Sequence, residues 1–499
     1  MISVQRLVRW LYNEFGIASV YRTGPDTWLV ILARTCRMFA FGAISLIFAL
    51  FMSSLDFSDV RIGLFMTMTL AGDVVLSLLV ALVADRLGRR RILFAGGLLM
   101  VLSGAAFNVF ENYWILLFAA VVGVVSATGG DFGPFRSVEE STLSHLTTLR
   151  TRSDVLSWYV TTSSLGSAVG TEIAGRLVGV LRGLKGQTAT GAYHSMFWVY
   201  IVMGTMTMVL TLLMSDRCEA TEAVPTGAKA TEPLLGAERQ VGASDDGRDD
   251  SRDVQASPVG VRPETASQGS LRARPLLRRL WGASRLAQIS PESRSVVYQL
   301  WTLLTIDSLA DGMVSYTLTN YYLARKFRLS ESYLGDIMST SYLLMSISTV
   351  FAGPLARRLG LVNTMVFTHI PSSAAVLLFP IPRSVGLTIA LLFIRTGLNN
   401  MDQAPRAAFI AAVVRPEERT AVMGITGMLR TLASAIGPSL TGFLAGTDRF
   451  WIAFVVAGAL RIGYDIGLFC LFVGLKLDAD ESTDDRVASP RRSEEEVGN

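Results

Sequence analysis

Two carboxylates, Asp307 and Asp311, stand four residues apart within the apolar segment 297–323. In a helix they share one face. An ionisable side chain at membrane depth is costly, so it usually faces a cavity and takes part in function. A third carboxylate, Asp73, lies in another apolar segment, twelve residues before a charged loop, or about 18 Å along a helix. Neighbouring carboxylates can bind and release protons, so the pattern predicts a proton-coupling site inside a membrane.

Two arginines, Arg34 and Arg37, occupy the first apolar segment. Arg37 aligns with Asp307, which lies 270 residues later in the chain. We expect these two side chains to pair, because pairing compensates the burial of each charge. The alternative is that both arginines extend to the membrane interface, where long basic side chains reach water.

A second set of polar residues occupies the fourth and tenth apolar segments. Asp131-x-x-Pro134 returns as Asp402-x-x-Pro405, and each proline disrupts a helix. We expect a gating or solute-binding role, although a structural kink network explains the pattern equally well. The set comprises Asp131, Arg136, Arg395, Asn399, Asn400, Asp402 and Arg406, and we add Tyr316 with Asn320 in the seventh segment as cavity candidates.

Other charged residues fit a structural role. Glu139 and Glu140 fall in a predicted loop and are expected to bind nothing. Arg430 and the pair Arg461 and Asp465 are expected to form structural pairs at the periphery.

Apolar segments long enough to span a bilayer recur along nearly the whole chain. Its 499 residues are 17% charged, whereas a soluble protein carries about 25%. Backbone groups in lipid must bond internally, so the segments predict an all-α membrane protein. We expect twelve transmembrane helices, at 29–53, 62–84, 92–110, 113–134, 155–181 and 195–214 in the first half and at 297–323, 333–356, 361–380, 384–405, 421–446 and 450–474 in the second.

A polar stretch, 216–294, separates the two halves and is rich in small and charged residues. It has too few large apolar residues to pack a core, so we predict a disordered cytoplasmic linker. The remaining predicted parts are a cytoplasmic segment at 1–28, helical bundles at 29–215 and 295–476, and a disordered tail at 477–499. Arginine-rich loops fall on the side that holds both termini, which predicts that side to be cytoplasmic.

Three motifs return at offsets of 267–272 residues. Residues 81–91 (ALVADRLGRRR) return as 353–363 (GPLARRLGLVN), and 165–175 (LGSAVGTEIAG) return as 432–442 (LASAIGPSLTG). The third is the aspartate-proline motif above. Three ordered matches indicate an internal duplication, and parallel repeats of this kind place a solute site between them near the membrane midplane.

This arrangement resembles the major facilitator superfamily over the whole chain outside the linker and tails. Residues 85–91 look like that family's signature loop between the second and third helices, although Ala81 stands where the signature begins with glycine. The resemblance implies two pseudo-symmetric six-helix bundles, with a solute site between the first, fourth, seventh and tenth helices. It also implies a conformational latch formed by Asp85, Arg86, Gly88, Arg89 and Arg90.

The expected activity is secondary active transport of a small organic solute by alternating access, coupled to protons. Efflux is favoured over uptake by the signature loop, and a non-transporting receptor or scaffold on the same fold is a further alternative. The chain lacks the G-x-x-x-x-G-K-[ST] nucleotide cradle that a primary pump needs. His145, His194 and His369 lie in different segments, so no enzyme, metal site or cofactor is expected.

The expected partners are a small-molecule solute, protons and the lipid bilayer. The net charge of +4 comes from arginines in short loops and tails, which is typical of a cytoplasmic membrane face rather than a nucleic-acid-binding surface. We expect a monomer in the plasma membrane, with an organelle membrane as the alternative.

The two copies of the repeated loop differ where Asp85 is replaced by Arg357. A carboxylate near a helix N-terminus is favourable, and only the first copy can provide one. We therefore expect Asp85→Asn to remove most solute flux in proteoliposomes, while Arg357→Gln leaves most of it. Equal losses in the two variants would show that both loops only set topology.

Overall fold

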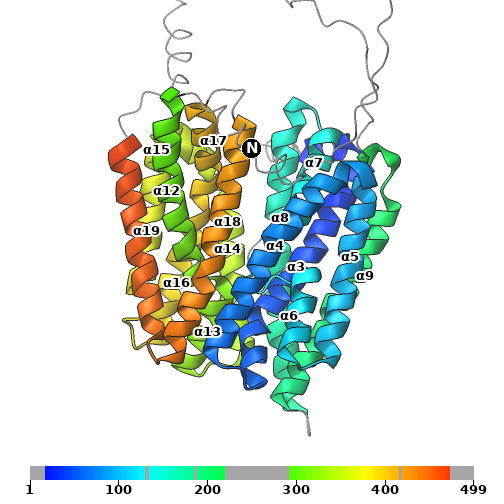
Figure 1. The fold of residues 1–499 in the computed structure, drawn as a ribbon, viewed down its shortest axis with the longest axis vertical. Helices are drawn as coiled ribbons and strands as arrows, with labels where there is room; N and C mark the ends of the chain where they lie inside the picture. The colour runs from blue at the N-terminus through cyan, green and yellow to red at the C-terminus, as the bar shows by residue number, and fades with distance from the viewer. Residues whose placement is uncertain (1–16, 130–133, 185–187, 220–290, 415–418, 473–499) are drawn as a thin grey trace, which may run out of the picture. The chain divides into compact units, whose positions relative to one another are not determined.

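The computed structural model describes residues 17–129, 134–184, 188–219, 291–414 and 419–472 (Figure 1). These residues form sixteen α-helices and two short 3-10 helices, and they contain no β-strand. The N-terminal half contains α2 (Ile17–Thr23), α3 (Pro25–Ser54), α4 (Asp59–Leu87), α5 (Arg89–Val109), α6 (Tyr113–Val122), α7 (Pro134–Leu146), α8 (Leu149–Gly183), α9 (Ala189–Leu213) and η1 (Asp216–Cys218). The C-terminal half contains α12 (Pro291–Met313), α13 (Tyr316–Phe327), α14 (Glu331–Leu359), α15 (Leu361–Leu378), α16 (Val385–Asn399), η2 (Asn400–Asp402), α17 (Gln403–Val413), α18 (Arg419–Gly446) and α19 (Phe450–Phe472).

These helices build the predicted fold, with twelve membrane-spanning segments in two halves of six. The fourth, seventh and tenth spans each consist of two helices, α6 with α7, α12 with α13 and α16 with α17. The sequence predicts an end of the fourth span at residue 134 and of the tenth at 405. In the structure α7 continues the fourth span to Leu146, and α17 continues the tenth to Val413. Of the predicted linker, residues 220–290 lie outside the described residues.

Among the described residues, six helices are long and apolar enough to cross a membrane by length and composition alone. These are α3, α4, α5, α9, α15 and α19. The other spans are broken into two helices or carry more polar side chains. They also supply most of the wall of the cavity described below. Polarity is therefore concentrated where helices face a cavity rather than lipid.

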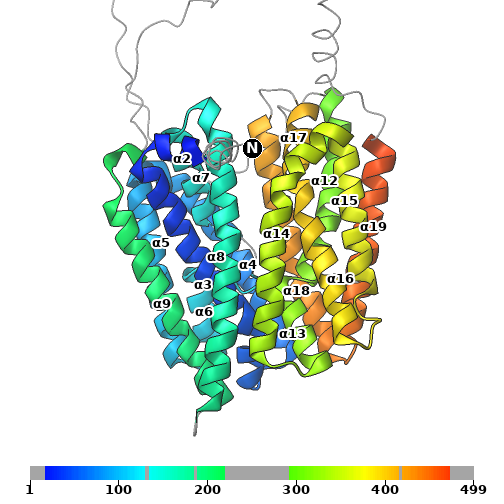
Figure 2. The same ribbon diagram turned by 180° about the vertical axis from the view of Figure 1, so that it is seen from behind.

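The two halves lie side by side as separate helix bundles (Figures 1 and 2). We call the side on which Glu219 and Pro291 lie the linker side, and the opposite side, on which Ser58 and Ser330 lie, the far side. Within the halves, α3 packs on α8 and α12 packs on α18. Between the halves, α8 packs on α14 and α4 packs on α18. Each half therefore contributes one helix to each of two crossings.

The internal duplication is clearest in α4 and α14, which are both 29 residues long. Each begins after a serine, Ser58 or Ser330, whose hydroxyl accepts a backbone N–H from the first turn. Each ends at a glycine, Gly88 at φ 95° or Gly360 at φ 85°. Residues with a Cβ rarely adopt this conformation, so the glycine of the repeated loop is required by the backbone.

Glycines also make the two close crossings between the halves. A Cβ on Gly63 of α4 would lie 2.9 Å from the Cα of Gly442 in α18, and a Cβ on Gly175 of α8 would lie 2.9 Å from the Cα of Gly335 in α14. The repeat relates the crossings, because Gly335 follows Gly63 by 272 residues and Gly442 follows Gly175 by 267. Both crossings lie toward the far side.

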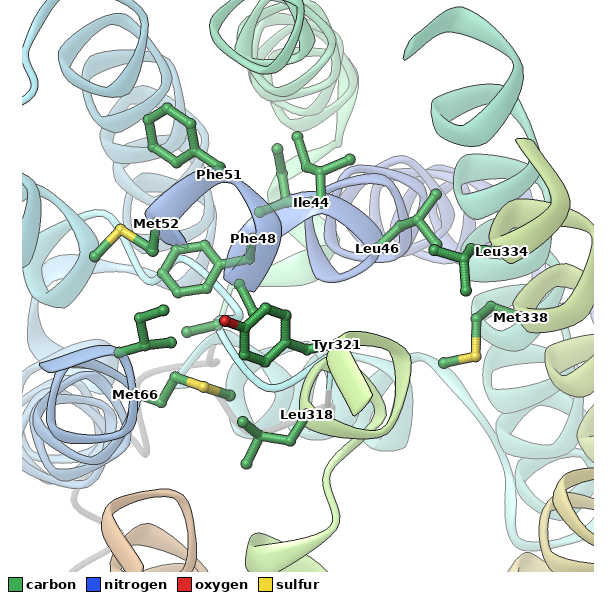
Figure 3. Packing of buried hydrophobic residues seen from close by; sticks show 14 of the residues in the cluster. Ile44, Leu46, Phe48, Phe51, Met52, Met66, Leu318, Tyr321, Leu334 and Met338 are labelled. Carbon is green, nitrogen blue, oxygen red and sulfur yellow. The ribbon is translucent and has the colours of Figure 1, made fainter. Parts of the chain in front are cut away.

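Apolar side chains fill the space between the halves on this side. Figure 3 shows one buried cluster to which α3, α4, α13 and α14 all contribute. Its labelled members are Ile44, Leu46, Phe48, Phe51, Met52, Met66, Leu318, Tyr321, Leu334 and Met338. Because the cluster draws on both halves, its close packing holds the far side together.

Gly170 of α8 faces the backbone of α3, and a Cβ there would lie 2.0 Å from the carbonyl oxygen of Phe39. We expect Gly170→Ala to lower the free energy of unfolding by about 1–3 kcal/mol, because two backbones must move apart. The measurement is the thermal midpoint in detergent. Gly183→Ala in the same helix is the matched control, since a Cβ there meets no described atom within 4 Å. Equal midpoints for the two variants would contradict this packing.

Candidate functional site

A cavity of about 440 Å³ lies between the two halves. The first span, through Met38, and the fourth and fifth spans form its wall on one side, and the seventh, eighth, tenth and eleventh form it on the other. Met423, one turn from the linker-side end of α18, lines the cavity and is 44% exposed. The crossings and the apolar cluster close the far side. The charged residues of the wall are Arg136, Asp311, Arg395, Arg406 and Arg430.

Arg461 of α19 connects this wall to a buried charge network. It is fully buried and donates from Nη1 to Asp311, at 2.7 Å. Its Nη2 donates to Nε2 of His369, at 2.7 Å, and to the side-chain oxygen of Asn399. Asp311 and Asn399 both line the cavity. The sequence pairs Arg461 with Asp465 at the periphery, and that prediction is wrong, because Arg461 turns inward where a buried cation finds a carboxylate.

His369 of α15 stands behind the cavity wall between carboxylates of two helices. Its Nδ1 lies 2.7 Å from Asp465, and its Nε2 lies 3.6 Å from Asp307. A guanidinium only donates, so Nε2 accepts from Arg461 and the ring proton belongs on Nδ1, where it donates to Asp465. The neutral ring therefore satisfies both partners at once.

Ser373 completes this group, but it does not form a nucleophile and base with His369. Its hydroxyl donates to Asp465 at 2.8 Å and lies 3.3 Å from Nδ1, the ring nitrogen that also faces the carboxylate. A catalytic serine and its aspartate occupy opposite ring nitrogens. The three side chains therefore lack the geometry of a serine nucleophile activated by a histidine base.

Asp307 is fully buried and contacts two basic groups at longer range. It lies 3.6 Å from Nη1 of Arg406 and 3.6 Å from Nε2 of His369. Arg406 also forms an ion pair with Asp402, four residues before it on the tenth span. Asp307 and Asp311 thus share a helix face, as their spacing predicts, but they contact different cations.

Two arginines of the wall have only neutral partners among the described residues. Arg395 donates from Nη1 to the hydroxyl of Thr319, at 2.9 Å, and from Nη2 to the carbonyl oxygen of Val314, at 2.5 Å. That carbonyl is freed by the break between α12 and α13. Arg430 donates from Nε to the hydroxyl of Ser308, at 3.0 Å. Neither guanidinium has a carboxylate partner in the described part of the chain.

Arg37 does not pair with Asp307. Its Nη1 donates to Glu139 of α7 at 2.7 Å, and Arg34 lies 3.5 Å from the other oxygen of the same carboxylate. Tyr159 donates to that oxygen at 2.8 Å. The prediction that Glu139 lies in a loop and binds nothing is wrong, because α7 continues the fourth span and buries this side chain completely.

The other predicted residues separate into cavity and interface positions. Arg136 lines the cavity and pairs with Glu140 at 2.7 Å. Tyr316 also lines it, with its ring 5.0 Å from that of Tyr342. Asn320 donates instead to the carbonyl oxygen of Leu46 in the other half, at 2.5 Å.

Asp73 of α4 is 3% exposed and does not line the cavity. One of its carboxylate oxygens has no hydrogen-bond partner among the described residues. Asp131 lies outside the described residues.

The predicted latch is described only in part. Glu219 accepts from the backbone N–H of Arg89 at 2.6 Å and of Arg90 at 3.3 Å, and Arg90 also pairs with Asp216. This carboxylate caps the N-terminus of α5 directly after Gly88, which is favourable for the helix dipole. The side chains of Asp85 and Arg86 lie outside the described residues.

Sequence reasoning missed the roles of His369, Arg430, Arg461 and Glu139. A usable signal was present for the two arginines, because a cation within an apolar span usually faces the bundle interior. A lone histidine gives no such signal until its carboxylate partners are known.

The comparisons with known proteins agree with this architecture. The family model described as Major Facilitator Superfamily matches residues 30–289 and 300–495. The chain belongs to the Major Facilitator Superfamily. This member is 31% identical to an uncharacterized membrane protein of Saccharomyces cerevisiae over 443 residues, which are 88% of this chain and 92% of that protein. Family and fold together make it an integral, multi-pass membrane transporter.

Solved transporter structures share the superfamily fold. The nucleoside transporter NupG gives a TM-score of 0.62 at 11% identity, over 91% of this chain and 100% of that one. The peptide transporter POT in complex with sulfate gives 0.61 at 13% identity, over 89% and 94%. The human organic anion transporter MFSD10 gives 0.55 at 15% identity, over 89% and 100%. At these identities the likeness shows the fold alone.

Arg461 offers a test of the buried network. Removing one partner of a buried ion pair leaves an uncompensated charge, so we expect Arg461→Met to lower the free energy of unfolding by about 3 kcal/mol or more. Adding Asp311→Asn should restore part of that loss, because the carboxylate left unpaired is then neutral. Thermal midpoints in detergent measure both, with exposed Arg449→Met as the control. A double variant no more stable than Arg461→Met would contradict the pairing.

Proposed function

We propose that this superfamily member moves a small organic solute across its membrane by alternating access, coupled to protons. The observation that carries the proposal is the central cavity, which both halves line and the far-side contacts close. Its volume of about 440 Å³ suits a small organic molecule. With the linker and both termini on the cytoplasmic side, as the arginine-rich loops indicate, the cavity faces inward.

Opening toward the far side requires charged contacts between the halves to break. Asp59, at the start of α4, accepts from Arg325 of the other half at 2.6 Å. Its repeat counterpart Glu331, at the start of α14, accepts from Arg182 of α8 and, at 2.8 Å, from Tyr193 of α9. Both lie at the ends of the glycine crossings. We infer that the contacts of Asp59 and of Glu331 break, and that the two helix crossings separate with them, when the cavity becomes accessible from the far side.

A proton on His369 would change the contacts around the cavity. The neutral ring accepts from Arg461, whereas the protonated ring has no acceptor and would be repelled by that guanidinium. Asp307 lies 3.6 Å from the same Nε2 and is the carboxylate to which the protonated ring would turn.

Arg461 transmits this change to the solute site, because it also holds Asp311 on the cavity wall. Arg406 provides a second route, since it lines the cavity and lies 3.6 Å from Asp307. We therefore place proton coupling at Asp307, Asp311 and His369.

Other predicted residues keep proposed roles. Asp73 and Arg37 stay candidates for coupling within the N-terminal half. Arg136, Tyr316 and Asn399 are proposed to contact the solute, because all three line the cavity. Asp402 is proposed to act through Arg406.

Asp307→Asn and Asp311→Asn, singly and together, test the coupling. The tracer is a solute found by a thermal-shift screen of metabolites and drugs. We expect Asp307→Asn to lose flux driven by a pH gradient across proteoliposomes by about tenfold or more, while solute exchange without a gradient continues. The sign of the accompanying pH change separates antiport, which efflux would use, from symport.

Asp56→Asn is the control, because Asp56 is exposed in a far-side loop and asparagine tolerates its φ of 60°. If the double variant shows the same pH-driven flux as the native chain, proton coupling at these aspartates is wrong. Saturable flux without any pH dependence would support solute transport and contradict its coupling to protons.

A further inference from the structure

We propose that the solute of this transporter is an organic anion, whose carboxylate or phosphate group binds at the cavity wall that contains Arg395 and Arg430. That the bound anion is the transported solute rests on the proposed transport function. The binding itself can be measured without transport.

The cavity wall carries an excess of positive charge. Four arginines line it, Arg136, Arg395, Arg406 and Arg430, and among the described residues Asp311 is the carboxylate that lines it with them. Arg136 is paired with Glu140, and Arg406 is paired with Asp402. Arg395 and Arg430 remain as cations with only neutral protein partners among the described residues.

Arg430 offers free donors to a ligand. A guanidinium has five N–H groups in a planar fork. In the described part of the chain, Arg430 uses Nε for Ser308, at 3.0 Å, and neither terminal nitrogen contacts a protein acceptor. Because the side chain lines the cavity, those two nitrogens are placed to bind both oxygens of one carboxylate or phosphate.

Arg395 is positioned by its hydrogen bonds without being neutralised by them. Thr319 and the freed carbonyl of Val314 fix its guanidinium. These acceptors satisfy donors but carry no formal charge, and the side chain is 5% exposed. Burying a cation without a counter-ion is costly. An anionic ligand would supply the missing charge, so the structural role of Arg395 and the proposed role support each other.

The nearby carboxylates do not supply that charge. Asp307, Asp402 and Asp465 are at most 1% exposed, do not line the cavity and contact His369 or Arg406. Asp311 does line the cavity, but its carboxylate is already paired with Arg461. A cationic solute would have to displace Arg461 and approach four arginines, so it is disfavoured.

Thermal stabilisation of the purified full-length chain tests the ligand class. The probes are succinate, benzoate and glucose 6-phosphate, each with its neutral analogue, succinamide, benzamide or glucose. We expect one or more anions to raise the thermal midpoint in proportion to concentration, with no shift from the neutral analogue. Arg430→Gln should weaken the apparent affinity for that anion by about tenfold or more, as loss of a charge-assisted hydrogen bond does.

Matched variants separate recognition from stability. Arg395→Lys should keep part of the affinity and Arg395→Gln should lose more, because lysine retains charge without the planar fork. Arg449→Gln removes the same charge from an exposed site away from the cavity and should leave the affinity unchanged. Stabilisation by a neutral analogue equal to that by its anion, no shift with any anion, or unchanged affinity in both arginine variants would each overturn the proposal.

A thiol-labelling experiment tests the same wall without knowing the solute. Met423→Cys places a thiol on the cavity wall, seven residues or about 10 Å along α18 from Arg430. Cys470 is exposed and is replaced by serine, whereas Cys36 and Cys218 are buried. Burial also raises the pKa of the Cys218 thiol to about 12, which keeps it unreactive.

We expect an anionic methanethiosulfonate to react faster than a cationic one, relative to their rates with a free thiol. Arg430→Gln should lower that ratio by about twofold or more, the effect of one charge near 10 Å in a water-filled cavity. A ratio that favours the cationic reagent, or one unchanged by Arg430→Gln and Arg395→Gln, counts against the proposal. Anion binding without solute flux would leave this inference standing and remove the proposed transport function.

Discussion

The pairing of charge inside a medium that cannot solvate it is the constraint on which this structure depends. An unpaired ion at membrane depth costs several kcal/mol, so charged side chains must find partners within the protein. Arg461 meets this demand by joining Asp311 to His369. Glu139 meets it in the other half by accepting from Arg37 and Tyr159. The partners come from different helices, so each network also fixes how the spans of its half pack.

The same constraint explains why the two halves share a scaffold but differ in chemistry. The fourth and tenth spans are both broken, whereas of the repeat-related first and seventh spans only the seventh is. That break frees the carbonyl of Val314, and Arg395 donates to it. The intact first span instead carries Arg37, whose partner Glu139 lies on α7. In the N-terminal half Arg37 is thus paired with an internal carboxylate, while in the C-terminal half Arg395 and Arg430 line the cavity without one among the described residues.

Much of the fold follows from the sequence, because the apolar length of a segment and the return of a motif 267–272 residues later can both be read along the chain. The partner of a buried side chain cannot be read in this way, because it depends on how distant segments pack. Arg37 and Asp307 align in the repeat, but repeat alignment reports equivalent positions rather than contacts. Glu139 looked like a loop residue because α7 is polar along its length, and its burial depends on how that helix packs. His369 is paired with Asp465, 96 residues away, and no local pattern records that distance.

The repeat includes the positions where the halves touch, and this agrees with how the molecule is expected to move. Gly63 and Gly335 occupy equivalent positions, and so do the carboxylates Asp59 and Glu331. Two equivalent crossings can open in a single rotation of one half against the other, because the distance between the helices increases at both crossings together. Charges that bind a solute gain nothing from duplication, since one ligand needs only one set of donors. Motion therefore requires equivalent contacts in both halves, whereas Arg395 and Arg430 can bind one ligand from one half alone.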